Sequence, residues 1–539
     1  MAVSTFPSTT VPPNAYTRFP LVSDVEATLA SPATMLTIFG LHKITLPIDI
    51  IYHIIDIGTF DSGDIEDYML FPLRMSHVCR TWRGMTLNTS RLWRTITYKG
   101  PPKLPKLPLM RGTLQPPTEY YPLICLFLER SEERSIDIHL DLRQPDYNYS
   151  VVEHDVTGKG HPIDNLLSVL TPHASRIKTF TFISNNWTDV VQVLRHHIYA
   201  LNMPNLERFE LTRAHLSQTF RPTFDRPSLG TWVPFCVQPI DMAQLLASRA
   251  VQDERKWPKA KQVKWPMVKH VVLIGVPLAW RLWSFYGLTS LKLNYLAGNE
   301  LLSAKNMRHV FRAVAPALRQ LEIHGSSPVA DDSDKQSQVE LPRLEMLSIG
   351  FARTAQVTWL TKTLLTPALT SLEIVDIFQC YYQYCRHVEA VEPKGEPSTR
   401  DVTKLCSEML EHMPFPLDKI TRLTLRYLIL GQLGGEDFVP AVGTDNASLP
   451  PAARFLLSLP ALDTLTLEST DFERLAVHLF RNPVNLPKRN VRALEVLTCS
   501  PWRMAFDGDH HGAESKTSRL KDGKWATVDG DMSNWMALV

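Results

Sequence analysis

Cysteine is scarce in this chain, and the few cysteines that are present follow no spacing pattern. The 539 residues include seven: Cys79, Cys125, Cys236, Cys380, Cys385, Cys406 and Cys499. A small, odd and scattered set argues against a disulfide scaffold and favours a reducing compartment. The N-terminus also lacks a basic segment followed by an apolar core, so we expect no secretory signal.

Long apolar runs are also missing. The longest run, Val271 to Trp280, is interrupted by Gly275 and Pro277. A helix needs about 20 consecutive apolar residues to cross a bilayer. We therefore expect no membrane association, and a location in the cytoplasm or the nucleus.

No charge of one sign dominates, and no catalytic motif stands out. Lysine and arginine total 57 against 55 acidic residues, and the net charge of +2 argues against a dedicated nucleic-acid binder. There is no Gly-x-Ser-x-Gly turn, no glycine-rich phosphate loop and no His-Glu-x-x-His helix. We therefore expect a protein that is not an enzyme and has no cofactor.

Two segments could still hold a ligand. Cys380 and Cys385 lie near His387, but their spacing does not match a zinc site, and we expect a structural loop. Residues 256–265 interleave lysines with two tryptophans, a pattern that suits a phosphate backbone or an acidic protein segment. The alternative is an exposed loop with Trp265 packed below it.

The stretch from Leu46 to Ile96 contains two apolar helical patterns. In the first, Leu46, Ile50, Ile51, Ile54 and Ile55 recur at helical spacing, with Pro47 near the first turn. In the second, Val78 and Trp82 belong to the run Val-Cys-Arg-Thr-Trp, and Leu92-Trp93 follows. So short a segment buries little apolar surface alone, which predicts a partner.

These landmarks resemble the F-box family. The Leu-Pro start, the helix of branched residues, the Val-Cys-Arg-x-Trp run and the closing Leu-Trp occur in the family's order. The resemblance implies docking onto the adaptor subunit of a cullin–RING ubiquitin ligase, and through it onto a cullin. The adaptor-binding residues that it implies are Leu46, Pro47, Ile50, Ile51, Ile54, Val78, Trp82 and Trp93. The insert from Asp56 to Leu70 departs from the family pattern.

Further along the chain, a six-residue frame of the form apolar-x-x-apolar-x-apolar recurs. It starts at Ile177, Leu206, Val268, Leu288, Leu318, Leu344, Leu369, Ile420, Leu462 and Val491. Spacings near 20 to 30 residues are typical of leucine-rich repeats, and the frames resemble the irregular repeats common behind F-boxes. The first, fourth and sixth residues should point inward. The alternative is an unrelated α/β domain with several such strands.

The expected fold class is thus α/β, with a small all-α F-box module followed by an irregular leucine-rich-repeat solenoid. We expect a disordered leader over residues 1–40, the F-box-like domain over 41–98 and a proline-rich linker over 99–119. The repeats should span 120–500, with insertions at 379–418 and 431–450, and a polar tail should span 501–539.

Side chains between the buried frame residues should project from the sheet and bind a target protein. They are Lys292, Asn294, Glu322, His324, Glu373, Arg426 and Glu468. The predicted function is therefore a substrate-recognition subunit of a cullin–RING ubiquitin ligase. The alternative is a leucine-rich-repeat scaffold that binds protein without any ligase role.

Overall fold

The computed structural model describes most of the predicted helices and strands. The described residues are 47–60, 65–100, 120–143, 162–194, 203–213, 263–276, 283–284, 287–295, 303–328, 338–351, 354–377, 402–412, 416–426, 428, 451–468, 493–498, 516–521 and 524–527. The chain divides into two compact units, Met1–Trp93 and Arg94–Val539.

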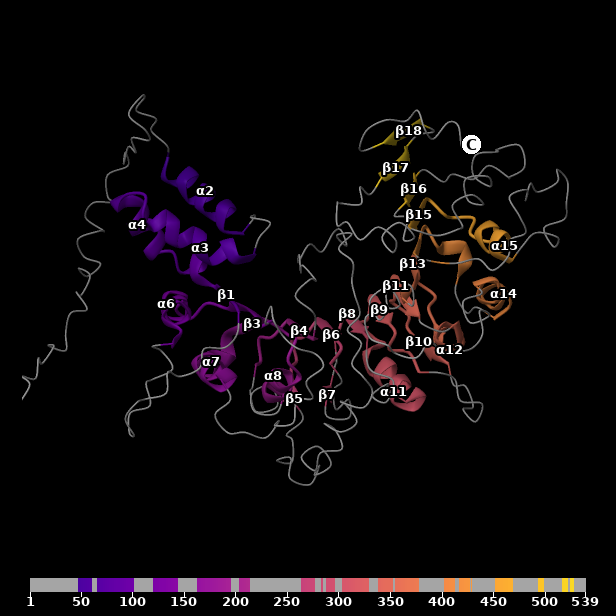
Figure 1. Ribbon diagram of the computed structural model, residues 1–539, viewed down its shortest axis with the longest axis horizontal. Coiled ribbons are helices and arrows are strands. Elements are labelled where there is room, and N and C mark those ends of the chain that lie inside the picture. Colours follow the sequence, from indigo (N-terminus) through magenta and orange to yellow (C-terminus); the bar gives the residue numbers. More distant parts are fainter. Residues whose placement is uncertain are drawn as a thin grey trace, which may run out of the picture. The chain divides into compact units, whose positions relative to one another are not determined.

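The described part of the first unit is helical. It comprises α2 (Ile48–Phe60), α3 (Ile65–Ser76), α4 (Arg80–Leu87) and the short 3-10 helix η1 (Ser90–Trp93), and α3 packs against both α2 and α4 (Figure 1). In α2, Ile51, Ile55 and Thr59 repeat every four residues and are buried, so this side of the helix forms the core of the unit.

One long sheet organises the second unit. Its strands are β1 (Thr95–Lys99), β2 (Ile136–Asp141), β3 (Ile177–Ser184), β4 (Arg208–Arg213), β6 (His270–Ile274), β8 (Ser290–Asn294), β9 (Gln320–His324), β11 (Met346–Phe351), β13 (Ser371–Asp376), β14 (Arg422–Arg426), β15 (Thr464–Glu468), β16 (Ala493–Thr498), β17 (Lys516–Lys521) and β18 (Lys524–Thr527). The spatial order of these 14 strands follows the chain. Pairing is parallel from β1 to β16, whereas β17 and β18 pair antiparallel. The other described strands form two small sheets, β5 (Val263–Lys264) with β7 (Trp283–Ser284) and β10 (Val339–Glu340) with β12 (Leu364–Leu365).

Each predicted frame whose side chains are described places its apolar residues in the core. In the frame that contains β9, for example, Leu318, Leu321 and Ile323 are all at most 2% exposed. The strand begins at the third frame residue, and successive strand residues point to opposite faces, so the fourth and sixth share one face. Each buried aliphatic side chain stabilises the fold by roughly 1.5–3 kcal/mol. The prediction that the frames are buried strands is confirmed for these residues.

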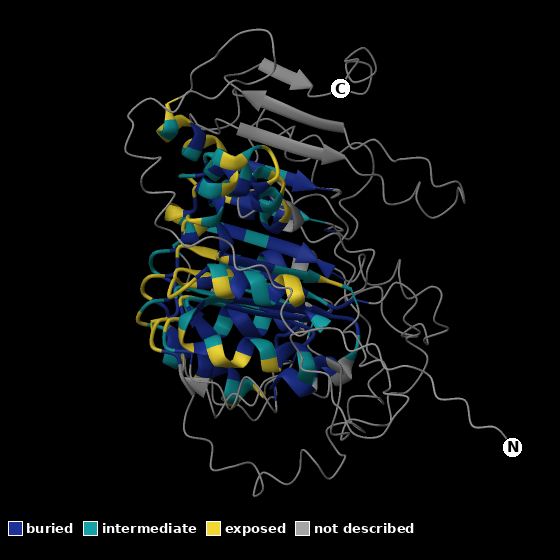
Figure 2. Cartoon of the chain, turned by 90° about the vertical axis from the view of Figure 1, so that its left-hand side faces the viewer, coloured by how far each residue is buried: buried dark blue, intermediate teal, exposed yellow. Residues whose placement is uncertain are grey.

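Helices connect many of the strands and pack on the sheet. They are α6 (Pro122–Arg130), α7 (Pro162–Leu170), α8 (Trp187–Gln192), α11 (Ala304–Val314), α12 (Thr354–Thr363), α14 (Val402–His412) and α15 (Pro451–Leu457), with the 3-10 helices η2 (Thr171–Arg176) and η6 (Leu417–Lys419). In α11, the Ser303 hydroxyl caps the first turn by accepting a hydrogen bond from the Asn306 N–H at 3.2 Å. The apolar residues Met307, Val310, Phe311 and Val314 then form one buried face. Figure 2 shows strands that are mostly buried, with exposed residues on the helices and on the turns between the elements.

The expected fold class is wrong. The structure has an α/β fold built on one long, mostly parallel sheet, rather than a small all-α F-box module followed by an irregular leucine-rich-repeat solenoid. The connections explain the difference, because they do not repeat one unit. A helix of 11 residues, α11, joins β8 to β9, whereas the described residues between β6 and β8 include a short strand and no helix. The α/β alternative considered from the sequence is therefore the better description.

Several sequence predictions fall largely outside the described residues. The leader over residues 1–40, most of the linker over 99–119 and the insertion at 431–450 belong to this group. The predicted tail after residue 500 contains β17 and β18, and β17 pairs with β16. Among the described residues, no helix is both long enough and apolar enough to span a membrane.

Candidate interaction surfaces

The outer side of α2 carries a row of exposed aliphatic side chains. Ile50 is 45% exposed, Ile54 41% and Ile57 47%. Their spacing of four and three residues places them on one helix face. We call these three residues the α2 stripe. Ile51 and Ile55 lie on the opposite side of the helix and are buried.

The eight predicted adaptor-binding residues therefore separate into two groups. Pro47, Ile50, Ile54 and Val78 are exposed, and Val78 reaches 54%. Ile51, Trp82 and Trp93 are buried, so their placement corrects the prediction that they contact a partner directly. Trp93 donates its indole N–H to the Thr86 carbonyl at 2.9 Å, which is a core contact. Leu46 lies outside the described residues.

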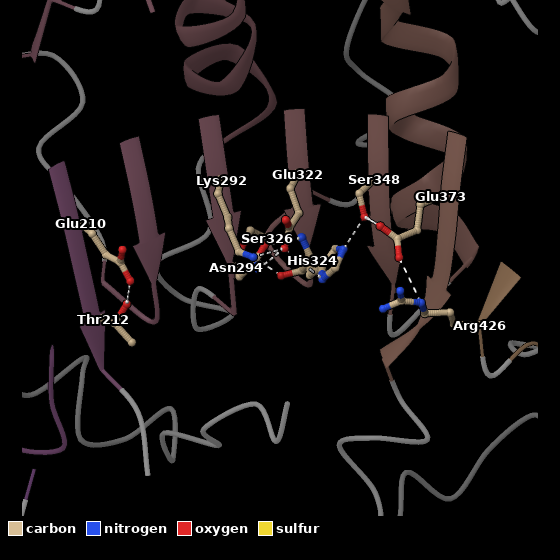
Figure 3. Close-up of polar contacts among 10 residues, drawn as sticks. All are labelled: Glu210, Thr212, Lys292, Asn294, Glu322, His324, Ser326, Ser348, Glu373 and Arg426. Carbon is tan, nitrogen blue, oxygen red and sulfur yellow. Dashed lines mark hydrogen bonds and ion pairs between the residues drawn. The ribbon is translucent and has the colours of Figure 1, made fainter. Parts of the chain in front are cut away.

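The second surface lies on the polar face of the sheet, where side chains of adjacent strands meet (Figure 3). Lys292 Nζ lies 2.7 Å from Glu322 Oε1, and Asn294 donates its side-chain N–H to the same oxygen at 2.7 Å. Asn294 Oδ1 in turn accepts the backbone N–H of His324 at 3.1 Å. These contacts join β8 to β9.

The same chain of contacts continues to the next strands. His324 Nε2 lies 2.8 Å from the Ser348 hydroxyl, which donates to Glu373 Oε2 at 2.7 Å. Arg426 Nε lies 3.1 Å from Glu373 Oε1 and 3.0 Å from Glu468 Oε2. All seven predicted target-binding residues thus belong to one connected set that also includes Ser348. We call these eight residues the sheet-face network.

A glycine makes the centre of the network possible. Gly350 stands opposite His324 in the sheet register. A Cβ atom added at Gly350 would lie 2.6 Å from His324 Cγ and 2.7 Å from His324 Cβ, closer than atoms can pack. The imidazole therefore lies across β11 over Gly350, and this position lets it reach Ser348.

The charges of the network fix the protonation of Glu322. Burial would raise the pKa of its carboxyl, but the charges of Lys292 and His324 outweigh burial. Hydrogen bonds from Lys292 and Asn294 act in the same direction and bring the pKa down to about 2. Because the Glu322 side chain is still 28% exposed, the network presents an ionised carboxylate to solvent at neutral pH.

Glu210 has the opposite character. It lies on β4, apart from the network, with its carboxyl 3.4 Å from the Thr212 hydroxyl (Figure 3). Burial raises its pKa from 4.5 to about 7, against the lowering effect of the Arg208 and Lys292 charges. This carboxyl therefore takes up a proton near neutral pH.

Sequence reasoning missed Ser348 and Gly350, although Ser348 lies in a predicted frame and Gly350 directly follows it. Ser348 occupies the same frame position as Glu322 and Glu373, and Gly350 the same position as His324. Neither residue has a charged side chain, so no feature of the sequence singled it out as a binding residue.

The other candidate sites add little. Trp265 is buried and its ring centroid lies 4.8 Å from that of Phe209, as expected for a packed loop residue. Residues 256–262, Cys380, Cys385 and His387 lie outside the described residues. Within the described ranges, no three His, Cys, Asp or Glu side chains are grouped so that they could hold a metal ion.

Comparison with known families gives no further assignment for either surface. No protein-family model matches the chain, and neither does any curated protein sequence.

Proposed function

We propose that this chain is a substrate-recognition subunit of a cullin–RING ubiquitin ligase. The α2 stripe binds the adaptor subunit, and the sheet-face network binds the target protein. The protein performs no bond chemistry itself. It raises the effective concentration of the target near the ubiquitin-carrying enzyme, a contribution that depends on binding alone.

The observation that carries this proposal is the exposure of the α2 stripe. Three isoleucines on one helix face, each more than 40% exposed, leave apolar surface in water. Contiguous apolar surface of this kind marks a protein interaction site. The sequence order of Leu46-Pro47, Val78-Cys79-Arg80-Thr81-Trp82 and Leu92-Trp93 adds the resemblance to adaptor-binding proteins.

The function implies a compartment that contains cullin–RING ligases. We therefore place the protein in the cytoplasm or the nucleus, which agrees with its small number of scattered cysteines.

The test replaces apolar surface by charge without disturbing the core. The double variant Ile50→Asp, Ile54→Asp should lose the adaptor subunit and the cullin in affinity purification from cells. Asn88→Asp is the control, because Asn88 is an exposed residue of the same helical unit and lies outside the α2 stripe. The control should retain both subunits, and both variants should unfold at the temperature of the wild type.

Two results would overturn the proposal. One is unchanged recovery of the adaptor with the double variant. The other is a wild-type purification that contains other proteins but neither adaptor nor cullin, which would indicate a protein-binding scaffold with no ligase role.

A further inference from the structure

The long sheet ends in an antiparallel hairpin. β17 pairs with β16, and β18 pairs with β17. Among the described strands, none lies beyond β18 (Figure 1). A strand at the end of a sheet leaves one row of its backbone N–H and C=O groups without a strand partner. At the opposite end, Thr95 and Ile96 of β1 are only 4% and 0% exposed, which leaves no room beside them for an added strand. The hairpin is therefore the end of the sheet that can accept one.

The register of the hairpin shows which backbone groups are open. Hydrogen-bonded and non-hydrogen-bonded residue pairs alternate along an antiparallel ladder. Lys521 and Lys524 stand opposite each other with two residues between them, so they form a hydrogen-bonded pair. The alternation makes Ala526 the next residue of β18 whose backbone bonds to β17. The N–H and C=O groups of Trp525 and Thr527 consequently point away from β17, toward the place of a further strand.

The hairpin is strongly basic, although the chain as a whole is nearly balanced in charge. Residues 516–527 contain four basic residues, Lys516, Arg519, Lys521 and Lys524, against one acidic residue, Asp522. Basic residues on an edge strand oppose pairing with a second copy of the same edge, because like charges would then face each other. The same charges favour an acidic segment through charge complementarity.

An apolar row of the sheet runs up to this edge. In the register, Leu465 on β15 stands opposite Leu494 on β16. Leu520 on β17 and Trp525 on β18 continue the same row. Leu465 is fully buried, so the row begins in the core. Sheets are commonly closed to further strands by an inward-pointing charged residue on the edge strand, whereas here a tryptophan occupies that place. The row therefore suits an apolar residue of one more strand.

Together these features specify the pattern of an added strand. Its residue opposite Trp525 lies in the apolar row. The two neighbours of that residue fall opposite Lys524 and Ala526, in the rows that also contain Lys521 and Arg519. Cross-strand neighbours of opposite charge stabilise a sheet, so both neighbours should be acidic. The pattern is the same for a parallel and an antiparallel strand, because both neighbours flank the apolar residue.

We propose that β18 binds an extended segment of the target protein in which acidic residues flank an apolar residue. The segment adds to the sheet as a further strand. Hydrogen bonds to the backbone of Trp525 and Thr527 hold it, and the basic residues of the hairpin select its charge. This inference rests on the proposed function, because it names the chemical class of target segment, and it gives the target a second contact besides the sheet-face network.

The test uses the full chain and three fluorescein-labelled nonapeptide libraries, whose central residues are Glu-Val-Glu, Glu-Pro-Glu or Lys-Val-Lys. Proline lacks an N–H, so the second library keeps the charge but weakens strand pairing. Fluorescence anisotropy should show the Glu-Val-Glu library binding at least about 10-fold more tightly than either of the others. Its advantage over Lys-Val-Lys should shrink as the salt concentration rises from about 50 to about 500 mM, because salt screens exposed charges.

Variants assign the binding to β18. Thr527→Pro removes an outward N–H and keeps the hydrogen bonds to β17, since proline is tolerated where the N–H of an edge strand faces outward. It should weaken binding of the Glu-Val-Glu library at least about 5-fold. Thr527→Val retains the N–H, so it is the matched control and should bind as the wild type. The double variant Lys521→Glu, Lys524→Glu should reverse the preference toward the Lys-Val-Lys library.

Equal binding of the three libraries, or a wild-type preference for Lys-Val-Lys, would overturn the inference. So would equal binding of Glu-Val-Glu and Glu-Pro-Glu, because charge alone would then be sufficient. Dimers of the full chain that Thr527→Pro dissociates in sedimentation would assign the edge to a second copy instead. A labelled oligouridine that binds more tightly than every peptide library would assign the hairpin to nucleic acid, and either result overturns the inference.

Adaptor recovery reports on α2 independently. Loss of peptide binding with the adaptor retained refutes this inference alone, and the reverse result refutes the ligase role alone.

Discussion

Replacing Gly350 by alanine should destabilise the protein, because the new methyl group would occupy the place of the His324 ring. The added Cβ would lie 2.6 Å from His324 Cγ and 2.7 Å from both Cβ and Cδ2. These atoms belong to the base of the side chain, which cannot move without the backbone or a new rotamer. The imidazole would leave Ser348, and their contact at 2.8 Å would be lost.

The magnitude follows from two effects. Overpacking in a filled site typically costs about 1–3 kcal/mol, and a lost hydrogen bond costs about 1 kcal/mol. Alanine in place of glycine in a strand returns roughly 0.5–1 kcal/mol, because glycine loses more chain entropy on folding. We therefore expect Gly350→Ala to lower the free energy of unfolding by about 1–3.5 kcal/mol in urea titrations followed by circular dichroism.

A double-mutant cycle makes this expectation specific. In the His324→Gly background both the Cβ and the ring are absent, so Gly350→Ala should be neutral or stabilising by up to about 1 kcal/mol. An equal loss of stability in both backgrounds would show that something other than the imidazole occupies the space over Gly350, and would refute the reasoning.

Three further expectations concern stability. Ile55→Ala should lower the free energy of unfolding by about 2–5 kcal/mol because Ile55 is fully buried, whereas Ile54→Ala, at a site 41% exposed, should change it by less than about 1 kcal/mol; chemical denaturation compares them directly. Tyr295 has a φ of 57°, in the left-handed region, so Tyr295→Gly should raise the melting temperature by relieving roughly 1 kcal/mol of backbone strain, and an unchanged or lower value would contradict that account of the strain. Glu210 has a folded pKa of about 7, above its ordinary 4.5, so the folded state binds more protons between these values and stability should fall as the pH rises through that window. Glu210→Gln should remove this slope, on the order of 3 kcal/mol in total, and urea titrations at several pH values that keep the slope would rule out Glu210 as its source.

The sequence predicts the sheet face in considerable detail. Once the apolar residues of a frame are taken as buried, its fifth residue and the residue that follows the frame must project from the other face. This reasoning identified Glu322 and His324 in one frame and Arg426 and Glu468 in two others, and the parallel register places the last two opposite each other.

The contacts between strands could not be predicted in the same way. Arg426 stands opposite Val375 in the sheet register, yet its side chain pairs diagonally with Glu373, which lies on the same strand as Val375. A long side chain can reach a diagonal neighbour, and which one it selects depends on the residues around it. The space over Gly350 is a property of two strands together, and neither frame shows it alone.

The predicted fold class failed for a different reason. The frames report only on the strands, and strands of this pattern occur in many α/β proteins. The connections decide the class, and their sequences carry no repeated signal, as the contrast between α11 and the helix-free described residues between β6 and β8 shows.

The strand order has a practical consequence for dissecting this protein. Within the long sheet, each strand from β1 to β16 pairs only with the preceding and the following strand of that sheet, so a cut between β4 and β5 severs a single ladder of the described strands. A chain opened between Arg213 and Val263 would yield two fragments, each with an unbroken series of paired strands, and the described strands of the two would pair along β4 and β6. If the two halves are co-expressed in this way, one part of the sheet can be labelled, and the spectra then contain signals from that part alone.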